Sequence, residues 1–209
     1  MRHISSKDEQ GPSGRKSAVS RTLILNAAAR LLRDQGYVAT TLRQIADAAN
    51  MKAGSIYYHF GSKEEILDEV LDRGVRFVFD AVKQAVSEAG PNASYRTRID
   101  CAITAHLEAL LEKNDYTSAN FRIYGQLPDD VKAKHRQLRL DYGEYWDTLL
   151  RDGQEAGEIR TDIAIAQLRM LILGALNWSL EWFNPDKHSV ETLAHQASLL
   201  VMDGIMKRR

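Results

Sequence analysis

The chain has 209 residues, enough for one fair-sized domain or for a small domain joined to a larger one. Its hydrophobic content of 44% and charged content of 27% are ordinary for a globular protein and exclude a chain that is disordered throughout. The formal net charge is zero, but residues 1–60 hold nine basic against four acidic side chains, which favours contact between that end and a polyanion.

Residues 1–19 form a separate N-terminal segment. They are rich in Ser, Gly, Lys and Arg and show no hydrophobic periodicity, so we expect a flexible basic tail. They lack the apolar stretch of a secretory signal, and Cys101, the single cysteine, excludes an internal disulfide. Both features favour a cytoplasmic protein.

Helical patterns begin at Ser20. The first helix is expected at about residues 21–35, and Gly36 is expected to end it. Its buried face is expected to carry Leu23, Ala27 and Leu31.

A second and a third helix follow, separated by a tight turn at residues 49–51. Thr41 caps the second helix, because Gln44 three residues later completes a capping box. Its buried stripe is expected to be Leu42, Ile45, Ala46 and Ala49. On the third helix Ile56 and Phe60 lie four residues apart and are expected to face inward, with Ala53 beside them.

The rest of the chain predicts six more helices and no sheet, because valine and isoleucine never alternate at period two over a useful length. These helices are expected at about residues 62–90, 94–113, 117–125, 128–153, 162–183 and 189–207. The fold class is therefore all-α, with about nine helices.

Residues 163–183 are nearly apolar on all sides. A membrane span is the rival interpretation, but Gln167, Arg169, Asn177 and Glu181 argue against it. A helix buried on most sides in so small a body favours a subunit interface, shared with the last helix in a homodimer. The expected interface residues are Leu168, Leu171, Ile172, Ala175, Leu193, Ala197, Leu200 and Gly204.

Residues 40–60 fit the mechanics of a helix-turn-helix, in which a short helix supports a second one across a tight turn. With Ile56 and Phe60 inward, Ser55 and Tyr58 point outward and Tyr57 lies on the flank. Small residues and exposed hydroxyls suit entry into a DNA major groove. Arg43 is the candidate for a guanine contact, and Lys63 at the next helix start is a candidate phosphate contact.

The segment "TTLRQIADAANMKAGSIYYHFGSKEEIL" resembles the DNA-binding domain of the tetracycline-repressor (TetR/AcrR) family, a resemblance that covers Ser20 to about Leu71. It implies an all-α homodimer that binds a palindromic operator in double-stranded DNA and is released by a small ligand in its C-terminal domain. The implied division is a tail at 1–19, a helix-turn-helix domain at 20–66, and a ligand-binding and dimerisation domain at 67–209.

The resemblance places the family's DNA-contact positions in and around the third helix. Many members have Ser where this chain has Lys52, and often a basic residue where it has Ala53, so the operator sequence does not carry over. The implied contact residues are Thr41, Arg43, Lys52, Ala53, Ser55, Tyr57, Tyr58, His59 and Lys63.

The C-terminal part offers aromatic residues that either line an apolar ligand cavity or pack as plain core. These candidates are His106, Phe121, Tyr124, Tyr142, Trp146 and Trp178. Residues 177–196 resemble regulators of fatty-acid and steroid-ring catabolism that respond to acyl-coenzyme A thioesters. The coenzyme phosphates would meet the cations Lys132, Lys134, Arg136 and Arg139, which are otherwise a solvated basic face.

The leading interpretation is a ligand-responsive transcriptional repressor with a small hydrophobic or acyl-CoA effector. An all-α enzyme is the alternative from another class, but no GxSxG, HExxH, phosphate-loop or nucleotide-binding glycine motif is present, so no catalytic residue is predicted. A TetR-type activator with a different effector is a further alternative. A membrane-surface protein would need a basic amphipathic helix, and none is convincing. No cofactor or metal site is predicted.

Overall fold

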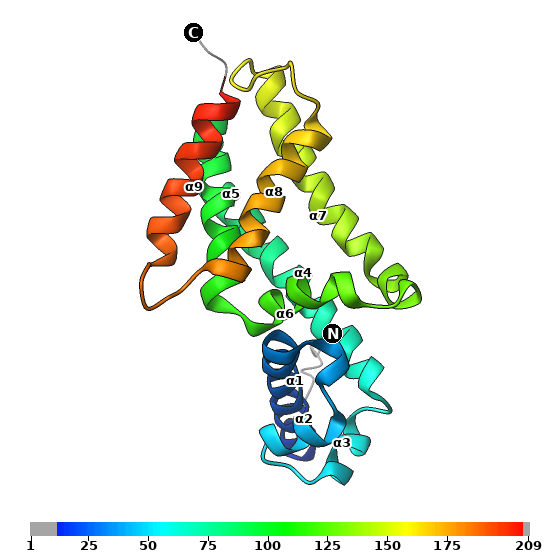
Figure 1. Cartoon of the computed structure of the whole chain (residues 1–209). Coiled ribbons are helices and arrows are strands. Elements are labelled where there is room, and N and C mark those ends of the chain that lie inside the picture. The colour runs from blue at the N-terminus through cyan, green and yellow to red at the C-terminus, as the bar shows by residue number, and fades with distance from the viewer. Residues whose placement is uncertain (1–11, 207–209) are drawn as a thin grey trace, which may run out of the picture.

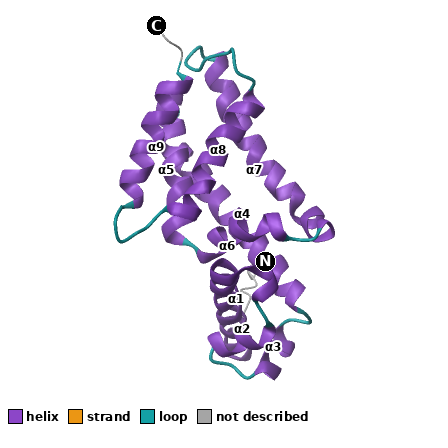
Figure 2. Cartoon of the chain, viewed as in Figure 1, coloured by secondary structure: helices purple, strands orange, loops and turns teal. Residues whose placement is uncertain are grey.

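A computed structural model describes the backbone of residues 12–206, and the side chains of all of these except residues 12–16 and 113. This part of the chain forms nine α-helices and no strand, which confirms the all-α fold (Figures 1 and 2). The helices are α1 (Pro12–Ala39), α2 (Leu42–Ala48), α3 (Ala53–His59), α4 (Lys63–Glu88), α5 (Tyr95–Glu108), α6 (Asp115–Ile123), α7 (Asp129–Glu155), α8 (Ile165–Trp182) and α9 (Val190–Ile205). A π-helical turn, η1 (Ala109–Lys113), follows α5, and a 3₁₀ turn, η2 (Tyr124–Gln126), follows α6.

The helices form two bodies connected by the long helix α4 (Figure 1). Helices α1–α3 and the beginning of α4 make the smaller body. In the larger body α5 and α7 pack on the rest of α4, α9 packs on α5, and α8 packs on α7. Each body has its own hydrophobic core, and along α4 Leu71 belongs to the first core and Val75 to the second. Ala119 and Ile123 of α6 help to complete the first core. The expected boundary at residue 66 thus stays a prediction, since the first core continues past it.

Helix α1 differs from expectation at its start and on its buried face. It begins at Pro12, so residues 12–19 are helical where a tail was expected, and the rest of that tail, residues 1–11, lies outside the described part. Leu23 was expected to be buried, but it is 47% exposed; the core is filled instead by Ile24, Leu25, Ala28 and Leu32, next to it on the helix. Gly36 was expected to end the helix; its φ of 80° and ψ of 178° break the helical backbone there, and a short helical segment continues to Ala39.

Helices α4 and α6 approach closely at Gly74. A Cβ at this position would lie 2.3 Å from the backbone oxygen of Tyr116. Two hydrogen bonds fasten the same contact, because Thr117 Oγ1 donates to the carbonyl of Gly74 at 3.1 Å and Asn120 Nδ2 donates to that of Leu71 at 2.7 Å. The connection between the two bodies is therefore tightly packed.

In the described part of the chain, no helix combines the length and apolar character needed to cross a membrane.

Candidate DNA-binding surface and ligand cavity

The turn between α2 and α3 is set by local capping. Thr41 and Gln44 form the predicted capping box at the start of α2. At its end Asn50 adopts a positive φ of 54°, and the backbone N–H of Met51 donates to the carbonyl of Ala46 at 2.9 Å. This left-handed residue with its six-to-one hydrogen bond is a Schellman motif, which turns the chain sharply toward α3.

Helix α3 presents a polar, aromatic side to solvent. Ile56 and Phe60 are buried as predicted, whereas Tyr57 is 63% and Tyr58 79% exposed. Ser55 is half-buried. Ala53 was expected beside the two buried residues, but it is exposed, because it lies at the first helical position and the core does not reach it.

Arg21 of α1 fixes the far end of α3. Its Nη1 donates to the carbonyl of His59 at 3.0 Å, and its guanidinium carbon lies 4.1 Å from the ring centre of Phe60. Its other nitrogen pairs with Glu69 of α4. A cation at a helix C-terminus satisfies carbonyls that have no intrahelical partner. Arg21 thereby holds α3 against both α1 and α4.

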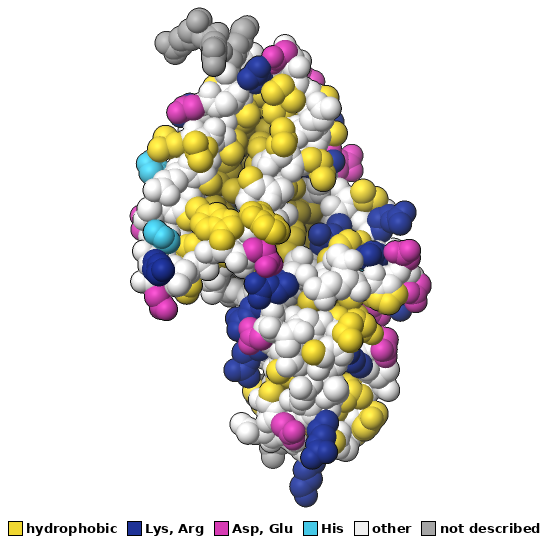
Figure 3. All heavy atoms as spheres, viewed as in Figure 1, with side chains coloured by type: hydrophobic (Ala, Val, Ile, Leu, Met, Phe, Trp, Pro, Cys, Tyr) yellow, Lys and Arg dark blue, Asp and Glu magenta, His cyan; other side chains and the backbone are white. Residues whose placement is uncertain are grey.

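The other predicted DNA contacts lie in different environments. Thr41, Arg43 and Lys52 are exposed, and Lys52 makes no side-chain cap. His59 is half-buried, and its ring meets that of Tyr58 edge-on at 4.9 Å. Figure 3 shows Lys and Arg side chains projecting at the lower end of the molecule, over α1–α3. We call the exposed set the recognition face: Thr41, Arg43, Lys52, Ala53, Tyr57 and Tyr58.

Lys63 is directed into the subunit. Its Nζ donates to the backbone carbonyl of Tyr37 at 2.5 Å and lies 4.0 Å from the centre of the Tyr37 ring. Burial lowers the pKa of the lysine amine. A phosphate contact by Lys63 stays a prediction, and it would require the side chain to leave Tyr37.

A cavity of about 240 Å³ lies in the larger body. Its wall consists of Val75, Phe121, Arg139, Tyr142, Gly143, Arg169, Met170, Leu173, Gly174 and Asn177. Of the predicted ligand residues, Phe121 and Tyr142 line it. His106 and Trp146 are buried behind the wall, and Tyr124 lies beneath Arg139. Trp178 is 66% exposed on α8 and does not line the cavity, because the inward side of α8 at this point is occupied by Asn177.

A buried hydrogen-bond chain supports this wall. The Nδ1 of His106 lies 2.7 Å from the hydroxyl of Tyr142, and its Nε2 lies 3.0 Å from Oδ1 of Asn177. An amide oxygen only accepts, so Nε2 carries the proton and Nδ1 accepts from the tyrosine. The rings of His106 and Tyr142 are parallel, 6.1 Å apart.

Arg139 places a positive charge in the wall. Its guanidinium lies 3.9 Å from the ring centre of Tyr124 and donates to Oδ1 of Asn120. Its contacts among the described residues are with Asn120 and two aromatic rings, with no carboxylate among them, and burial lowers its pKa. Of the other predicted cations, Lys132 pairs with an aspartate on its own helix, Lys134 pairs with Asp68, and Arg136 is exposed. Arg139 alone among the four lines the cavity.

Sequence reasoning missed two polar residues of the wall. Asn177 and Arg169, on α8, interrupt a nearly apolar segment, and that interruption was the available signal. Arg169 Nε donates to Asp147 Oδ1 of α7 at 2.8 Å, so its charge is compensated.

The buried histidine predicts a pH dependence of stability. Burial lowers the pKa of His106 from 6.5 to about 4, while its hydrogen bond with Asn177 acts in the opposite direction. Between these values the unfolded chain binds a proton that the folded chain does not, so stability falls as the pH drops. We expect His106 to contribute a loss of about 3 kcal/mol between pH 7 and pH 4. Urea unfolding at pH 7, 5.5 and 4.5 should show a shallower decline for His106→Gln than for the parent; parallel declines would contradict this assignment.

Helices α8 and α9 carry an exposed apolar face, and Figure 3 shows hydrophobic side chains gathered over them. Of the predicted interface residues, Leu171, Ala175, Leu200 and Gly204 are exposed, and Leu193 and Ala197 are half-buried. Leu168 and Ile172 are buried inside the subunit, because they face the core shared with α5 and α7, so their prediction as interface residues is wrong. Trp178 and Trp182 also belong to this exposed face.

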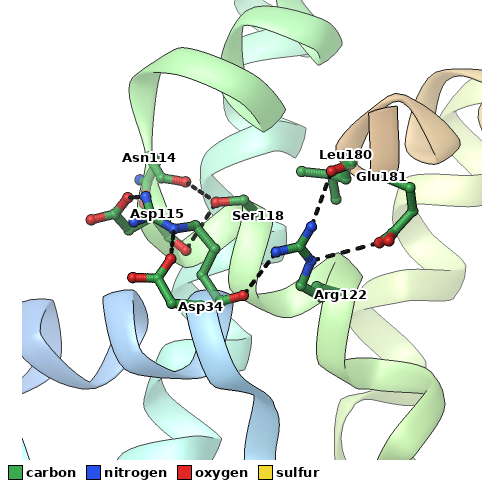
Figure 4. Close-up of polar contacts among 8 residues, drawn as sticks. Asp34, Asn114, Asp115, Ser118, Arg122, Leu180 and Glu181 are labelled. Atoms are coloured by element: carbon green, nitrogen blue, oxygen red, sulfur yellow. Dashed lines mark hydrogen bonds and ion pairs between the residues drawn. The ribbon is translucent and has the colours of Figure 1, made fainter. Parts of the chain in front are cut away.

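Arg122 of α6 connects the two bodies (Figure 4). Its Nη1 donates to the carbonyl of Arg33 in α1, and its Nη2 donates to the carbonyl of Leu180 in α8, both at 3.1 Å. Its Nε lies 3.6 Å from a carboxylate oxygen of Glu181. A second contact joins α1 to α6, where Arg33 pairs with Asp115. Arg122 thereby links the position of α8 to that of α1, the helix against which α3 packs.

Comparison with known proteins gives consistent matches over both bodies. A model described as "Bacterial regulatory proteins, tetR family" matches residues 24–70, and one described as "Tetracyclin repressor-like, C-terminal domain" matches residues 92–205. The chain is 31% identical over 205 residues to the HTH-type transcriptional repressor KstR2 of Rhodococcus jostii, covering 95% of this chain and 94% of that protein.

Solved structures agree. The ketosteroid transcriptional regulator KstR2 of Mycobacterium tuberculosis superposes with a TM-score of 0.79 at 25% identity, covering 90% of this chain and 95% of that one. AibR, solved in complex with isovaleryl coenzyme A and operator DNA, has the same fold, with a TM-score of 0.78 at 21% identity and coverage of 87% and 97%.

Proposed function

Because the chain belongs to the tetR family of bacterial regulatory proteins, we propose that it is a transcriptional repressor that binds a palindromic operator as a homodimer and leaves it when an acyl-CoA or another small hydrophobic effector binds. The regulator class, rather than an enzyme, follows from the family. The observation that carries the rest is the recognition face, with Tyr57 and Tyr58 exposed on α3 while Ile56 and the following Phe60 are buried in the core.

The recognition face suits the major groove. Its hydroxyl, ammonium and guanidinium groups donate to phosphates and base edges, and Ala53 permits close approach. The capping box and Arg21 fix the orientation of α3 before DNA is met, so little ordering is needed on binding.

The exposed face of α8 and α9 supports the homodimer. Two tryptophans and two leucines exposed on the consecutive helices α8 and α9 are side chains of the kind that protein interfaces cover. A two-fold axis there would pair two recognition faces, and dimers of this type need them about 34–36 Å apart.

The cavity supports an acyl effector. Its wall combines apolar side chains with Arg139, whose charge has no carboxylate partner in the described structure. The solved complex of AibR, a protein of the same fold, makes acyl-CoA thioesters the first class to test. Release would follow from a population shift, in which ligand moves α8, and Arg122 transmits the movement to α1.

The test is binding to DNA from upstream of the gene, followed by fluorescence anisotropy. We expect binding that weakens steeply with salt and is at least about a thousandfold tighter than to unrelated DNA of equal length. Isovaleryl-CoA, hexanoyl-CoA and longer thioesters should then be added, with free coenzyme A as control. Equal affinity for both DNAs would contradict the operator proposal, and release by none of the thioesters would contradict the effector class.

The dimer is tested by Leu200→Glu, which places a charge on the exposed face. We expect a monomer by sedimentation and an operator affinity reduced about a hundredfold or more, because two half-sites no longer bind together. His195→Glu, an exposed position on the same helix that lies about 140° around it from Leu200, is the matched control. A variant that stays dimeric would place the interface elsewhere.

A further inference from the structure

Only the oxygen of the Asn177 side-chain amide makes a hydrogen bond with a described residue. Its Oδ1 accepts from His106, which is itself fixed by Tyr142, while its Nδ2 group makes no hydrogen bond with any residue that the structure describes. The residue belongs to the cavity wall and is half-buried. An amide group whose oxygen is already bound has two N–H donors to offer.

The polar groups of the cavity wall offer hydrogen-bond donors rather than acceptors. Arg139 contributes N–H donors with a charge that no described carboxylate balances, and Arg169 contributes a guanidinium paired outside the wall with Asp147. Tyr142 uses its proton on His106. Among the described residues, no carboxylate lines the cavity. Such a wall matches a ligand oxygen that accepts hydrogen bonds, and it disfavours a ligand cation.

The remaining wall is apolar and the space is small. Val75, Phe121 and Leu173 leave about 240 Å³, below the roughly 300–1,000 Å³ of pockets that enclose a drug-sized ligand. The cavity therefore suits one end of a ligand, a short apolar group with an oxygen acceptor, and it is too small for a whole coenzyme.

From these observations we infer that Asn177 is a specificity-determining residue, which donates through Nδ2 to the acyl carbonyl or carboxylate oxygen of the ligand, with Arg139 beside it. His106 is a positioning residue, since it turns the amide so that its oxygen faces the core and its nitrogen faces the cavity. This inference rests on the effector class proposed above and identifies the protein atoms that recognise the ligand oxygen.

Binding of three probes separates the possible sources of the oxygen. Hexanoyl-CoA has a thioester carbonyl, S-hexyl-CoA lacks it, and hexanoate carries a carboxylate. By calorimetry the parent should bind hexanoyl-CoA or hexanoate at least about tenfold more tightly than S-hexyl-CoA, because a site built to bond an oxygen rejects the analogue without it. Preference for the thioester identifies a coenzyme A ligand, and preference for hexanoate identifies a free acid.

Asn177→Leu should weaken binding of the preferred probe at least about tenfold and leave S-hexyl-CoA unchanged, whereas Gln167→Leu, an exposed change on the same helix, should alter neither. His106→Leu should abolish the discrimination, and His106→Gln should restore part of it. Nitrogen NMR of the imidazole should show the proton on Nε2 without any ligand.

Unchanged discrimination in Asn177→Leu, or a proton on Nδ1 of His106, overturns this inference while the effector proposal survives. Equal parental affinity for all three probes also overturns it. Binding of none of them overturns the inference together with the proposed effector class.

Discussion

Replacing Gly74 with alanine should lower the free energy of unfolding by about 3 kcal/mol, because the added methyl group has no room. It would meet the backbone carbonyl of Tyr116 at 2.3 Å, and a backbone atom cannot rotate away as a side chain does. Helices α4 and α6 would have to separate, which would also strain the hydrogen bond from Thr117 to residue 74. Urea or thermal unfolding at pH 7 measures the loss.

Two other glycines provide graded controls for this prediction. At Gly153 a methyl group would meet the Cδ1 of Ile159 at 2.5 Å, and this far end of a flexible side chain can move, so we expect a loss of only about 1 kcal/mol. At Gly54 nothing lies within 4 Å, and alanine should stabilise α3 by up to about 1 kcal/mol. Equal stabilities of Gly74→Ala and the parent would mean that α4 and α6 are not packed as described.

Tyr58→Ala should reduce operator affinity by about tenfold to a hundredfold, the range for losing one good contact in a protein–DNA interface. The side chain is 79% exposed, so the free energy of unfolding should change by less than about 0.5 kcal/mol. Anisotropy titrations at one fixed salt concentration measure the affinity.

Tyr58→Phe identifies the part of the side chain that acts. If the hydroxyl binds phosphate or a base edge, phenylalanine should behave like alanine; if the ring alone packs on DNA, phenylalanine should bind like the parent. Leu140→Ala, an exposed change on α7, is the control for loss of surface area. Parental affinity in Tyr58→Ala would remove this residue from the recognition face.

The helices were predictable from the sequence where capping residues mark their ends. Thr41, Ser62 and Ser189 each accept from the backbone N–H three residues later, and serine or threonine at such a position marks a helix start in the sequence. The start of α1 was not predictable, because residues 12–19 lack the apolar periodicity that marks the buried face of a helix. The Schellman turn was predictable in position, since Asn50 tolerates a positive φ.

The sites were less predictable because they depend on contacts between distant segments. Lys63 turns inward toward Tyr37, a ring 26 positions earlier that local spacing does not reveal. On α8 the apolar side chains extend nearly all round, so periodicity could not say that Leu168 faces the core while Trp178 faces solvent. Packing against α5 and α7 decides this, and the same packing turns Asn177 toward the cavity.

The connection through Arg122 has a consequence for sequence drift within the family. Both of its strongest acceptors are main-chain oxygens, which any amino acid at positions 33 and 180 supplies equally. Mutations at those two positions therefore preserve both acceptors of Arg122, although a change of Arg33 removes its separate ion pair with Asp115. The two hydrogen bonds are sensitive to the distance between α1 and α8, because a shift of a few tenths of an ångström carries a 3.1 Å hydrogen bond beyond its usual length. Arg122 therefore holds α1 and α8 at one fixed separation.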